Sequence, residues 1–558
     1  MGVVLEVAFD DANAESLLAS WKEYATLLVG RHERSEGPDR SELVVRRHPG
    51  GASLFLSAPV DALMSSTDVN EHAWALAESG SRAQPAPTLV AELRAKMSSE
   101  RASRPNLADV YREALQRELN VTFDDELLTL GSGSGSSSWP LADIPHVAQI
   151  DWSALHDVPI ALVTGSNGKT TTTRLVAAMC RGAGKTTGWS CSDGVWIDDD
   201  QLEHGDYSGP GGARVVLRDA RVDAAVLETA RGGILRRGLA VSRARAAIIT
   251  NIAADHFGEY GVSSLHDLAE AKAVVARALG DSGCLVLNAD DPMLVELAEK
   301  LESRRAWFSV APDHPALDTH VTNGGDAATV HDGRVMLHVD DAWHDLGAVD
   351  AMPLTFGGAA PHNIQNILGA ALLASVLHVP TQTIRATLGR FGASPADNPG
   401  RLQIYRFGAL TVLVDYAHNP DGLEALCETA KKIPAKRRLL LLGQAGNRDD
   451  DQLRALARVA CNVIAFDRVI IKEMPSMLRG RSEGEISRVL AEELTMHDVP
   501  MERIDIAPNE LDAIRRAFTW ARESDLLVCP VHVEKEAMLS MLARMTERGW
   551  TAGATLPE

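Results

Sequence analysis

Residues 161–173 read ALVTGSNGKTTTT, an apolar strand that runs into a glycine loop, a lysine and a row of hydroxyl side chains. Gly165 and Gly168 allow successive backbone N–H groups to turn inward around an anion. Lys169 adds a positive charge, and Thr170 offers a hydroxyl oxygen of the kind that binds Mg²⁺. The segment therefore predicts a phosphate-binding loop at the start of a helix, with ATP or a related nucleotide as its ligand.

The motif Gly-x-x-Gly-Lys-Thr limits the classes of nucleotide-binding protein to which the chain could belong. Its two glycines are closer together than in the general kinase and GTPase pattern, Gly-x-x-x-x-Gly-Lys-[Ser/Thr]. An alternative interpretation is a glycine turn before a buried helix. The apolar residues at 160–163 and at Leu175, Val176 and Met179 supply the strand and helix that a phosphate-binding loop requires.

Length and composition limit the function classes. A chain of 558 residues predicts roughly three or four domains. The apolar share of 45% and the charged share of 23% are typical of globular proteins, and no long apolar run or leader predicts a membrane segment, so we expect a cytoplasmic protein. The six cysteines lack a Cys-x-x-Cys pair, which argues against a zinc site. A net charge of −21 argues against a nucleic-acid partner.

Alternating apolar and amphipathic segments predict an α/β protein of several domains. We expect a small N-terminal α/β domain at 1–130 and a Gly/Ser linker at 131–150, because 131–138 reads GSGSGSSS. A central P-loop domain with a parallel sheet is expected at 151–398, and a C-terminal Rossmann-like α/β domain at 399–558. The strands expected in the two larger domains are 160–163, 224–227, 246–250, 284–287, 411–414, 438–442, 468–471 and 526–528.

Three charged residues follow predicted strands or lie in a predicted helix. Glu228 ends the strand 224–227, at the sheet edge where open α/β folds bind ligands, so it is a candidate Mg²⁺ ligand rather than a surface carboxylate. His256 follows the strand 246–250 and is a second candidate ligand. Lys272 lies in an apolar helix, where a lysine that extends its ammonium group to solvent is the usual case, and spacing alone leaves its role open.

Nine segments, in order, resemble the Mur ligase superfamily of ATP-dependent amide ligases, and most of all the Mur-ligase-like half of cyanophycin synthetases. They are GSNGKTTTTRL, LETARGGILRRGL, TNIAADHFGEYG, EAKAVV, LNADDP, GGAAPHNIQNILGAA, NPGR, VDYAHNP and RGRSEGE. The chain lacks the ATP-grasp module that separates the two ends of those synthetases. It also lacks the Asp-Asn-Pro-Arg motif of the diaminopimelate-adding enzymes, because 397–401 reads DNPGR.

The resemblance implies roles for individual residues. The nucleotide-binding set would comprise Gly165, Ser166, Asn167, Gly168, Lys169, Thr170, Thr171, Asn363, Asn366, Arg401 and Asp415. The metal-binding set would comprise Thr170, Glu228, His256 and Lys272, and the last of these matches a position that is carbamylated in many members. The catalytic set would be Lys169, Glu228, His256 and Lys272. Two structural alternatives stay open, since Asn363 could cap a helix and Asp415 could end a strand.

Three functions remain open at this point. The first is an ATP- and Mg²⁺-dependent carboxylate–amine ligase that works through an acyl phosphate and joins a basic amino acid to an aspartyl side chain, as the resemblance implies. The second is a cell-wall-type ligase that acts on a nucleotide-linked peptide. The third is a P-loop kinase or a nucleotide-binding regulator. Small-molecule or peptide substrates are the expected partners, and the number of subunits is left open.

Overall fold

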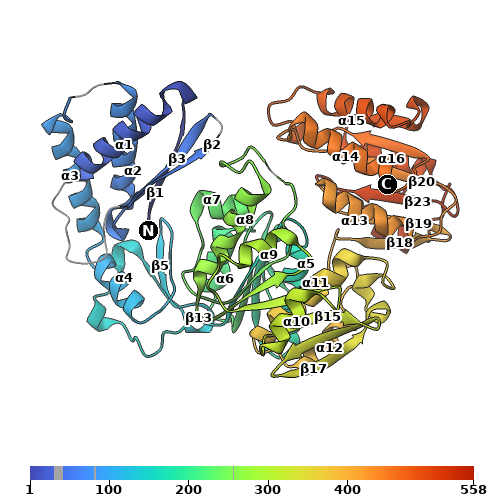
Figure 1. Ribbon diagram of the computed structural model, residues 1–558, viewed down its shortest axis with the longest axis horizontal. Helices are drawn as coiled ribbons and strands as arrows, with labels where there is room; N and C mark the ends of the chain where they lie inside the picture. The colour runs from blue at the N-terminus through green and yellow to red at the C-terminus, as the bar shows by residue number, and fades with distance from the viewer. Residues whose placement is uncertain (30–41, 49, 81–82, 256, 558) are drawn as a thin grey trace.

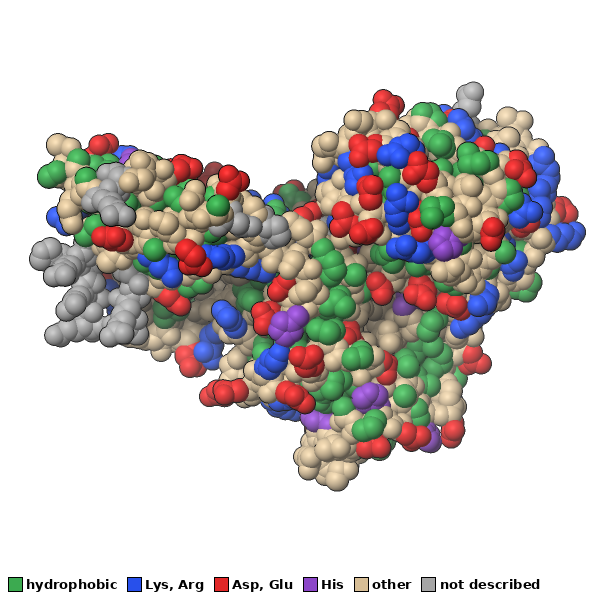
Figure 2. Space-filling view, turned by 45° about the horizontal axis from the view of Figure 1, so that its top comes forward, with side chains coloured by type: hydrophobic (Ala, Val, Ile, Leu, Met, Phe, Trp, Pro, Cys, Tyr) green, Lys and Arg blue, Asp and Glu red, His purple; other side chains and the backbone are tan. Residues whose placement is uncertain are grey.

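The structure is a computed structural model that describes residues 1–29, 42–48, 50–80, 83–255 and 257–557. Within these residues the chain forms four sheets. Figure 1 shows the N-terminal region (blue) and the C-terminal region (orange to red) on either side of the central region (green and yellow). In Figure 2 the two outer regions rise above the central one and leave a hollow between them.

The N-terminal region carries two small antiparallel sheets, in the orders β1-β3-β2 and β4-β5-β6. Its elements are β1 (Gly2–Ala8), α1 (Ala14–Val29), β2 (Leu43–His48), β3 (Gly51–Ser57), α2 (Leu63–Glu78), α3 (Pro87–Ser103), α4 (Leu107–Gln116), β4 (Val121–Phe123), β5 (Leu127–Leu130) and β6 (Ser137–Pro140). Alternate residues of β3 face α1 and α2, so Leu54 and Leu56 are buried with Trp21. Period-two burial of this kind is what a sheet covered on one face requires.

The expected Gly/Ser linker at 131–150 is a folded segment. Residues 137–140 form β6, which pairs with β5. Ser132 donates its hydroxyl to Asp157 Oδ1 at 3.0 Å and accepts from Val158 N at 3.1 Å, which ties the segment to the start of the central region. Gly133 has a φ of +57° and lies against Val222 and Val158. The glycines therefore serve close packing here, whereas composition alone suggested flexibility.

The central region is built on a sheet with the strand order β10-β9-β8-β11-β7-β12-β13-β14-β15-β16-β17. The strands are β7 (Ile160–Thr164), β8 (Thr187–Cys191), β9 (Gly194–Ile197), β10 (Asp200–His204), β11 (Ala224–Glu228), β12 (Ala244–Ile249), β13 (Leu279–Asn288), β14 (Arg305–Ser309), β15 (Ala327–His331), β16 (Arg334–Val339) and β17 (Ala342–Ala348). The helices are α5 (Lys169–Gly182), α6 (Pro210–Arg218), α7 (Arg231–Arg237), α8 (Leu265–Ala273), α9 (Pro292–Ala298), α10 (Pro315–Thr322), α11 (Pro361–Val376) and α12 (Thr381–Leu388).

Seven neighbouring strands run parallel to one another: β8, β11, β7, β12, β13, β14 and β15. Both faces of this part of the sheet are buried. Alternate residues of β7 divide between two cores: Ala161 and Val163 pack with α5 and α11, whereas Ile160 and Leu162 pack with α6 and α8. A strand that is covered on both sides needs an uninterrupted apolar run, which is what residues 160–163 provide. The strands predicted in this region are confirmed.

The C-terminal region has a second, largely parallel sheet in the order β18-β19-β23-β20-β21-β22. Its elements are β18 (Gln403–Phe407), β19 (Leu410–Asp415), α13 (Pro420–Lys431), β20 (Arg438–Leu442), α14 (Asp450–Asn462), β21 (Arg468–Lys472), α15 (Glu485–Met496), β22 (Ile504–Ala507), α16 (Glu510–Trp520), β23 (Leu526–Pro530) and α17 (Lys535–Glu547). Helices α13, α14 and α15 cover one face, and α16 and α17 cover the other. The predicted α/β class is confirmed.

Candidate active site

The glycine loop lies between β7 and α5, in the middle of the central sheet. Gly168 has a φ of +82°, and a Cβ there would overlap the side-chain oxygen of Asn366. Gly165 has a φ of +146°, and a Cβ there would overlap Thr250 Oγ1. The loop therefore needs glycine at both positions for backbone conformation and for space. Its backbone is held from the neighbouring strand, since Thr250 Oγ1 donates to Asn167 O at 2.6 Å.

The first cavity, of about 350 Å³, lies between the glycine loop and the C-terminal region. Its walls include ten of the residues predicted to bind nucleotide: Ser166, Asn167, Gly168, Lys169, Thr170, Thr171, Asn363, Asn366, Arg401 and Asp415. The cavity thus brings together segments that are far apart in the sequence, from the loop to β19. Its backbone N–H groups, its lysine and its arginine suit a polyphosphate.

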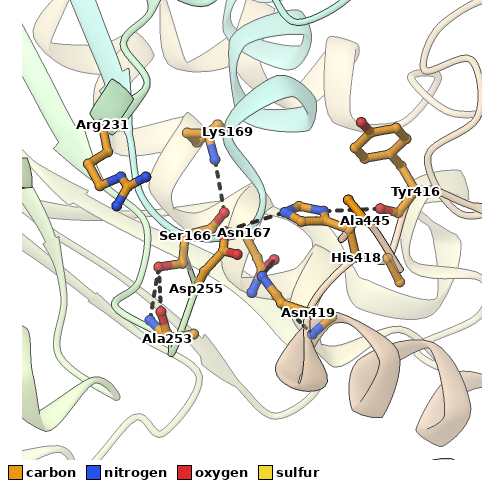
Figure 3. Close-up of polar contacts among 12 residues, drawn as sticks. Ser166, Asn167, Lys169, Arg231, Ala253, Asp255, Tyr416, His418, Asn419 and Ala445 are labelled. Atoms are coloured by element: carbon orange, nitrogen blue, oxygen red, sulfur yellow. Dashed lines mark hydrogen bonds and ion pairs between the residues drawn. The ribbon is translucent and has the colours of Figure 1, made fainter. Parts of the chain in front are cut away.

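Lys169 points back over the loop and donates its Nζ to Ser166 O at 2.8 Å (Figure 3). Thr170, in the first turn of α5, donates its hydroxyl to Glu228 Oε2 at 2.9 Å and contacts Ser192 Oγ at 3.1 Å. Burial raises the pKa of Glu228 above its usual range, although Lys169 and Arg401 oppose that shift. A buried carboxylate beside two hydroxyls is a cluster of oxygen donors, which is the ligand type that Mg²⁺ takes.

The oxygen cluster fits Mg²⁺ better than it fits zinc. Within the described residues, no three His, Cys, Asp or Glu side chains gather into a metal site. A Mg²⁺ ion needs only one or two carboxylates, because it keeps several waters and binds the phosphates of the nucleotide. Glu228 and Thr170 meet that requirement. His256, the other predicted ligand, lies outside the described residues.

Lys272 is buried in α8 and donates its Nζ to Gly165 O at 2.7 Å. Burial lowers its pKa well below the ordinary value, and the nearby Lys169 adds to that effect. The alternative of a lysine that reaches to solvent does not describe this side chain, which is 4% exposed. A buried amine with a depressed pKa is neutral more often than an exposed one, and a neutral amine is the form that can react.

The remaining predicted residues contact the loop or one another. Asn366 donates to Asn363 Oδ1 at 3.1 Å, and Asn363 donates to Leu354 O at 2.9 Å. Asn363 lies inside α11, so it is not the residue that caps the helix. Asp415 is the last residue of β19, as the strand-end alternative predicted, and its carboxylate accepts a hydrogen bond from Leu402 N at 2.6 Å. Burial raises the pKa of Asp415, and Arg401 opposes that shift.

The C-terminal region reaches the loop through several side chains. Arg401 stacks on Tyr416, with 4.3 Å from Cζ to the ring centre, and donates to Ser192 Oγ at 2.9 Å. Asn419 donates to Asn167 Oδ1 at 2.9 Å, as Figure 3 shows. Ser192 therefore joins Thr170 to Arg401, and the first cavity is closed by residues from both regions.

A second cavity, of about 590 Å³, lies on the other side of Lys169. Lys169, Gly165 and Lys272 line it, together with residues of α7 and of the loop after β12. At its edge Asp255 lies 3.4 Å from His418 Nε2 (Figure 3). Asp255 also accepts a hydrogen bond from Arg448 at 2.8 Å, and both contacts link the central region to the C-terminal region. Lys169 and His418 are common to the linings of the two cavities.

Sequence reasoning missed four charged or hydroxyl residues near the site. Ser192 and Asp193 follow β8, a buried strand whose sequence TGWSC has no apolar run, so the strand-end rule that singled out Glu228 had no signal there. That rule does apply to Arg448, in the loop after the apolar strand β20. Lys535, which forms an ion pair with Asp193, has no local signal, because its place depends on how α17 packs against the rest of the molecule.

Two domain families match the chain. The Mur ligase middle domain matches residues 163–374, and the Mur ligase glutamate ligase domain matches residues 400–530. A cyanophycin synthetase from Synechocystis sp. is 39% identical over 373 residues, which are 66% of this chain and 42% of that protein. The corresponding protein from Trichormus variabilis is 38% identical over 371 residues, 66% of this chain and 41% of that protein. The chain thus spans about two fifths of the length of these relatives.

More distant relatives agree with this assignment. A UDP-N-acetylmuramoyl-L-alanyl-D-glutamate–2,6-diaminopimelate ligase from Chlorobaculum tepidum is 27% identical over 386 residues, 66% of this chain and 70% of that protein. Solved structures with the same fold include MurF from Acinetobacter baumannii (TM-score 0.50, 17% identity, 69% of this chain and 77% of that one). Another is E. coli FolC in complex with DHPP and ADP (TM-score 0.50, 19% identity, covering 69% of this chain and 89% of that one). This chain belongs to the Mur ligase superfamily.

Proposed function

We propose that the protein is an ATP-dependent carboxylate–amine ligase that forms an amide through an acyl phosphate. The observation that carries this proposal is the position of Lys169 between two cavities. The first cavity suits a nucleotide, and the second has room for an acid next to the phosphates. Named relatives that are ligases support the same reaction class.

The proposed reaction has two steps. A carboxylate oxygen of the acid attacks the γ-phosphorus of ATP, and the bond between that phosphorus and the ADP oxygen breaks. The nitrogen of a neutral amine then attacks the acyl carbon, inorganic phosphate leaves with its bonding electrons, and the nitrogen loses a proton. The products are an amide, ADP, phosphate and a proton. No protein nucleophile is needed, so catalysis rests on position and charge.

Each step depends on groups of this chain. Lys169 lies where it can offset the charge of the transferring phosphoryl group, and Arg401 approaches the same place from the C-terminal region. Thr170 and Glu228 would hold Mg²⁺, with His256 as a further predicted ligand. That ion would neutralise phosphate charge. Closure by Asn419 and Arg401 would keep water from hydrolysing the acyl phosphate.

A modified Lys272 is part of the proposal. Its buried amine, with a lowered pKa, is a suitable target for CO₂, and the product would be an anionic carbamate. A carbamate would supply a negative group beside Gly165 and Lys169, where the unmodified lysine adds positive charge. Mass spectrometry of the intact protein in bicarbonate buffer, with Lys272→Met as the control, tests for the added carboxyl group.

The closeness to cyanophycin synthetases also supports a choice of substrates. We propose an aspartyl side-chain carboxylate as the acid and a basic amino acid, arginine or lysine, as the amine. The proposed division of the chain is a domain at 1–130, a connecting segment at 131–150, an ATP-binding domain at 151–398 and a closing domain at 399–558.

A matrix of acids and amines tests the function. ADP release should require both an acid and an amine, and the product mass should equal the sum of the two minus one water. ADP release with the acid alone, and a stable phosphorylated product, would instead identify a kinase. ADP release with a nucleotide-linked peptide only would identify a cell-wall-type ligase.

A further inference from the structure

Ser192 and Asp193 form the two-residue turn between β8 and β9. Ser192 contacts Thr170 and accepts from Arg401, so it belongs to the candidate active site. Asp193 lies next to it, with a side chain that is 11% exposed, and none of the proposed reaction steps uses it. A carboxylate at such a place needs partners of opposite charge, because burial is costly for an unpaired charge.

Each carboxylate oxygen of Asp193 has a cationic partner. Oδ2 accepts from Arg174 Nη2 at 3.1 Å, and Oδ1 accepts from Lys535 Nζ. Arg174 is held in place, since its Cζ lies 4.9 Å from the ring centre of Trp189 and 5.0 Å from that of Trp196. The two indole rings stack on each other with their centres 4.0 Å apart. Arg174 is therefore a partner fixed within the central region, whereas Lys535 comes from the C-terminal region.

Lys535 reaches Asp193 past the backbone segment that leads to Arg401. Gly400 has a φ of +70°, and a Cβ there would lie 2.7 Å from Cδ of Lys535. The glycine in the segment DNPGR therefore leaves room for the aliphatic part of the lysine. This packing sets the ammonium group of Lys535 at the carboxylate and close to the start of the C-terminal region.

Arg401 is the third cation near Asp193. It donates Nη2 to the Ser192 hydroxyl at 2.9 Å, one residue from the carboxylate, and its buried Nε has no hydrogen-bond partner among the described residues. Burial acts to raise the pKa of Asp193, but the three cations outweigh it and hold that pKa below its usual range. A carboxylate with a free oxygen would attract this guanidinium, because arginine and carboxylate form strong two-point contacts.

We propose that Lys535 is a positioning residue for Arg401. Lys535 occupies Oδ1 of Asp193 and so keeps that carboxylate from capturing Arg401, whose guanidinium then stays available for the γ-phosphate. The inference rests on the proposed function, which places the nucleotide phosphates between Lys169 and Arg401. It gives α17 a part in the site, although Lys535 lines neither the first nor the second cavity.

Binding of two nucleotides tests the inference without turnover. Isothermal titration calorimetry of the full chain with Mg²⁺ gives the ratio of the affinity for AMP-PNP, which carries a γ-phosphate, to the affinity for ADP. Lys535→Met keeps an aliphatic side chain beside Gly400 and removes the charge. We expect the ratio to fall about tenfold in this variant, since one charged contact to the γ-phosphate is lost. The affinity for ADP should stay the same, which also shows that the fold is intact.

The double variant Lys535→Met, Asp193→Asn distinguishes positioning from structural support. Asparagine has no charge with which to capture Arg401, so the ratio should return to within about threefold of the wild-type value. If Lys535 only supported the contact between the two regions, the second substitution would remove a further contact and would not restore the ratio.

Lys432→Met is the matched control. Lys432 is an exposed lysine of the C-terminal region that donates to Ala359 O in the central region at 3.2 Å, and it lines neither the first nor the second cavity. It should keep the wild-type ratio. The inference is overturned by a wild-type ratio in Lys535→Met, by a double variant that stays as low as Lys535→Met, or by an equal loss in Lys432→Met.

Arg401→Met separates the inference from the proposed function. It should show the same loss as Lys535→Met, and the combination of the two substitutions should have no further effect. A normal ratio in Arg401→Met contradicts the proposed place of the nucleotide and the inference with it, whereas a normal ratio in Lys535→Met alone contradicts only the positioning role. A chain that shows the expected ratios and forms no amide from any acid and amine contradicts the proposed function and leaves the positioning role in place.

Discussion

At the scale of single residues, the site depends on glycines whose neighbours leave no room for a side chain. Gly168 and Gly184 both have a φ near +80°, but they differ in surroundings. A Cβ on Gly168 would overlap Asn366, whereas nothing lies within 4 Å of a Cβ on Gly184. Replacing Gly184 by alanine therefore measures the cost of backbone conformation alone, whereas replacing Gly168 adds the cost of steric overlap.

Gly168→Ala should weaken nucleotide binding, because the added methyl group displaces Asn366 and the loop together. Gly184→Ala carries only the conformational cost, about 1–2 kcal/mol of stability. We expect the affinity for ADP to fall at least about tenfold in the first variant and to stay unchanged in the second, as measured by calorimetry. Equal affinities in the two variants would contradict the packing that the structure shows around Gly168.

Lys169→Met should abolish phosphoryl transfer while the fold survives. The side chain borders both cavities, and the loss of one preorganised charge at a reacting centre costs on the order of 100-fold or more in kcat. Release of ADP measures the effect, and circular dichroism checks the fold. Lys300→Met, at an exposed lysine paired with Glu296, is the control that should keep full activity. Normal turnover without Lys169 would refute its proposed role.

At the scale of elements, a buried charged network joins three parts of the C-terminal sheet. Lys472 at the end of β21 forms an ion pair with Glu510 at the start of α16 and lies 3.3 Å from His532 Nδ1, just after β23. His532 Nε2 contacts Ala417 O at 2.9 Å, and its ring meets Tyr416 edge-on. The network therefore fixes the segment that carries Asp415 and Tyr416 into the first cavity.

The network predicts a specific loss of stability in acid. Burial, together with the nearby Lys472, lowers the pKa of His532 to about 3. An unfolded histidine takes up a proton near pH 6.5, so stability falls as the pH drops from 6.5 toward 3, by at most about 1.4 kcal/mol per pH unit. Burial acts to raise the pKa of Glu510, but Lys472 outweighs it and holds that pKa at about 2, so this carboxylate adds a further loss below pH 4.5.

His532→Gln should flatten the stability curve between pH 6.5 and 4.5 and leave the loss below pH 4.5. Urea unfolding at a series of pH values, followed by circular dichroism, measures both windows. His331→Gln is the control, because that side chain is 62% exposed and should not change the slope. The same slope in wild type and His532→Gln would show that His532 is not kept neutral in the folded protein.

The sequence predicts a strand or a site residue correctly where a single local pattern determines its place in the fold. The strand 160–163 is apolar throughout because it is covered on both faces, and its neighbours share that property. Strand-end polarity located Glu228 beside Thr170. The flexibility expected of segment 131–138 is not what the structure shows, because a run of glycines can form either a flexible joint or a close contact. Contacts with Asp157 and Val222, which lie elsewhere in the sequence, make it a close contact here. Partners such as Lys535 depend on how two regions pack, which no local pattern records.

At the scale of the whole molecule, the site is assembled from two regions that meet over the glycine loop. Arg448 and Asp255 form a pair across that contact, and their side chains are 6% and 9% exposed. Lys535 with Asp193, and Arg401 with Ser192, add contacts nearby. The structure thus describes a closed arrangement of the kind that the proposed reaction requires, because an acyl phosphate must be kept from water.

Arg448→Met should weaken this closure, because it leaves Asp255 buried without its guanidinium partner. Removal of one member of a buried pair costs about 3–5 kcal/mol. We expect a larger radius of gyration in small-angle X-ray scattering and faster ADP release that is not coupled to amide formation. The double variant Arg448→Met, Asp255→Asn should recover part of the coupling. No change in radius and in coupling would contradict the role of the pair in closure.

The most direct test of the account follows an isotope through the reaction. The acid is labelled with oxygen-18 in its carboxylate and incubated with ATP and the amine that supports turnover, and mass spectrometry reads the phosphate released. We predict one labelled oxygen in each phosphate, because the acid attacks the γ-phosphorus before the amine arrives. Phosphate without label, with the lost carboxylate oxygen in water instead, would contradict an acyl phosphate, and with it the placement of acid and nucleotide on opposite sides of Lys169.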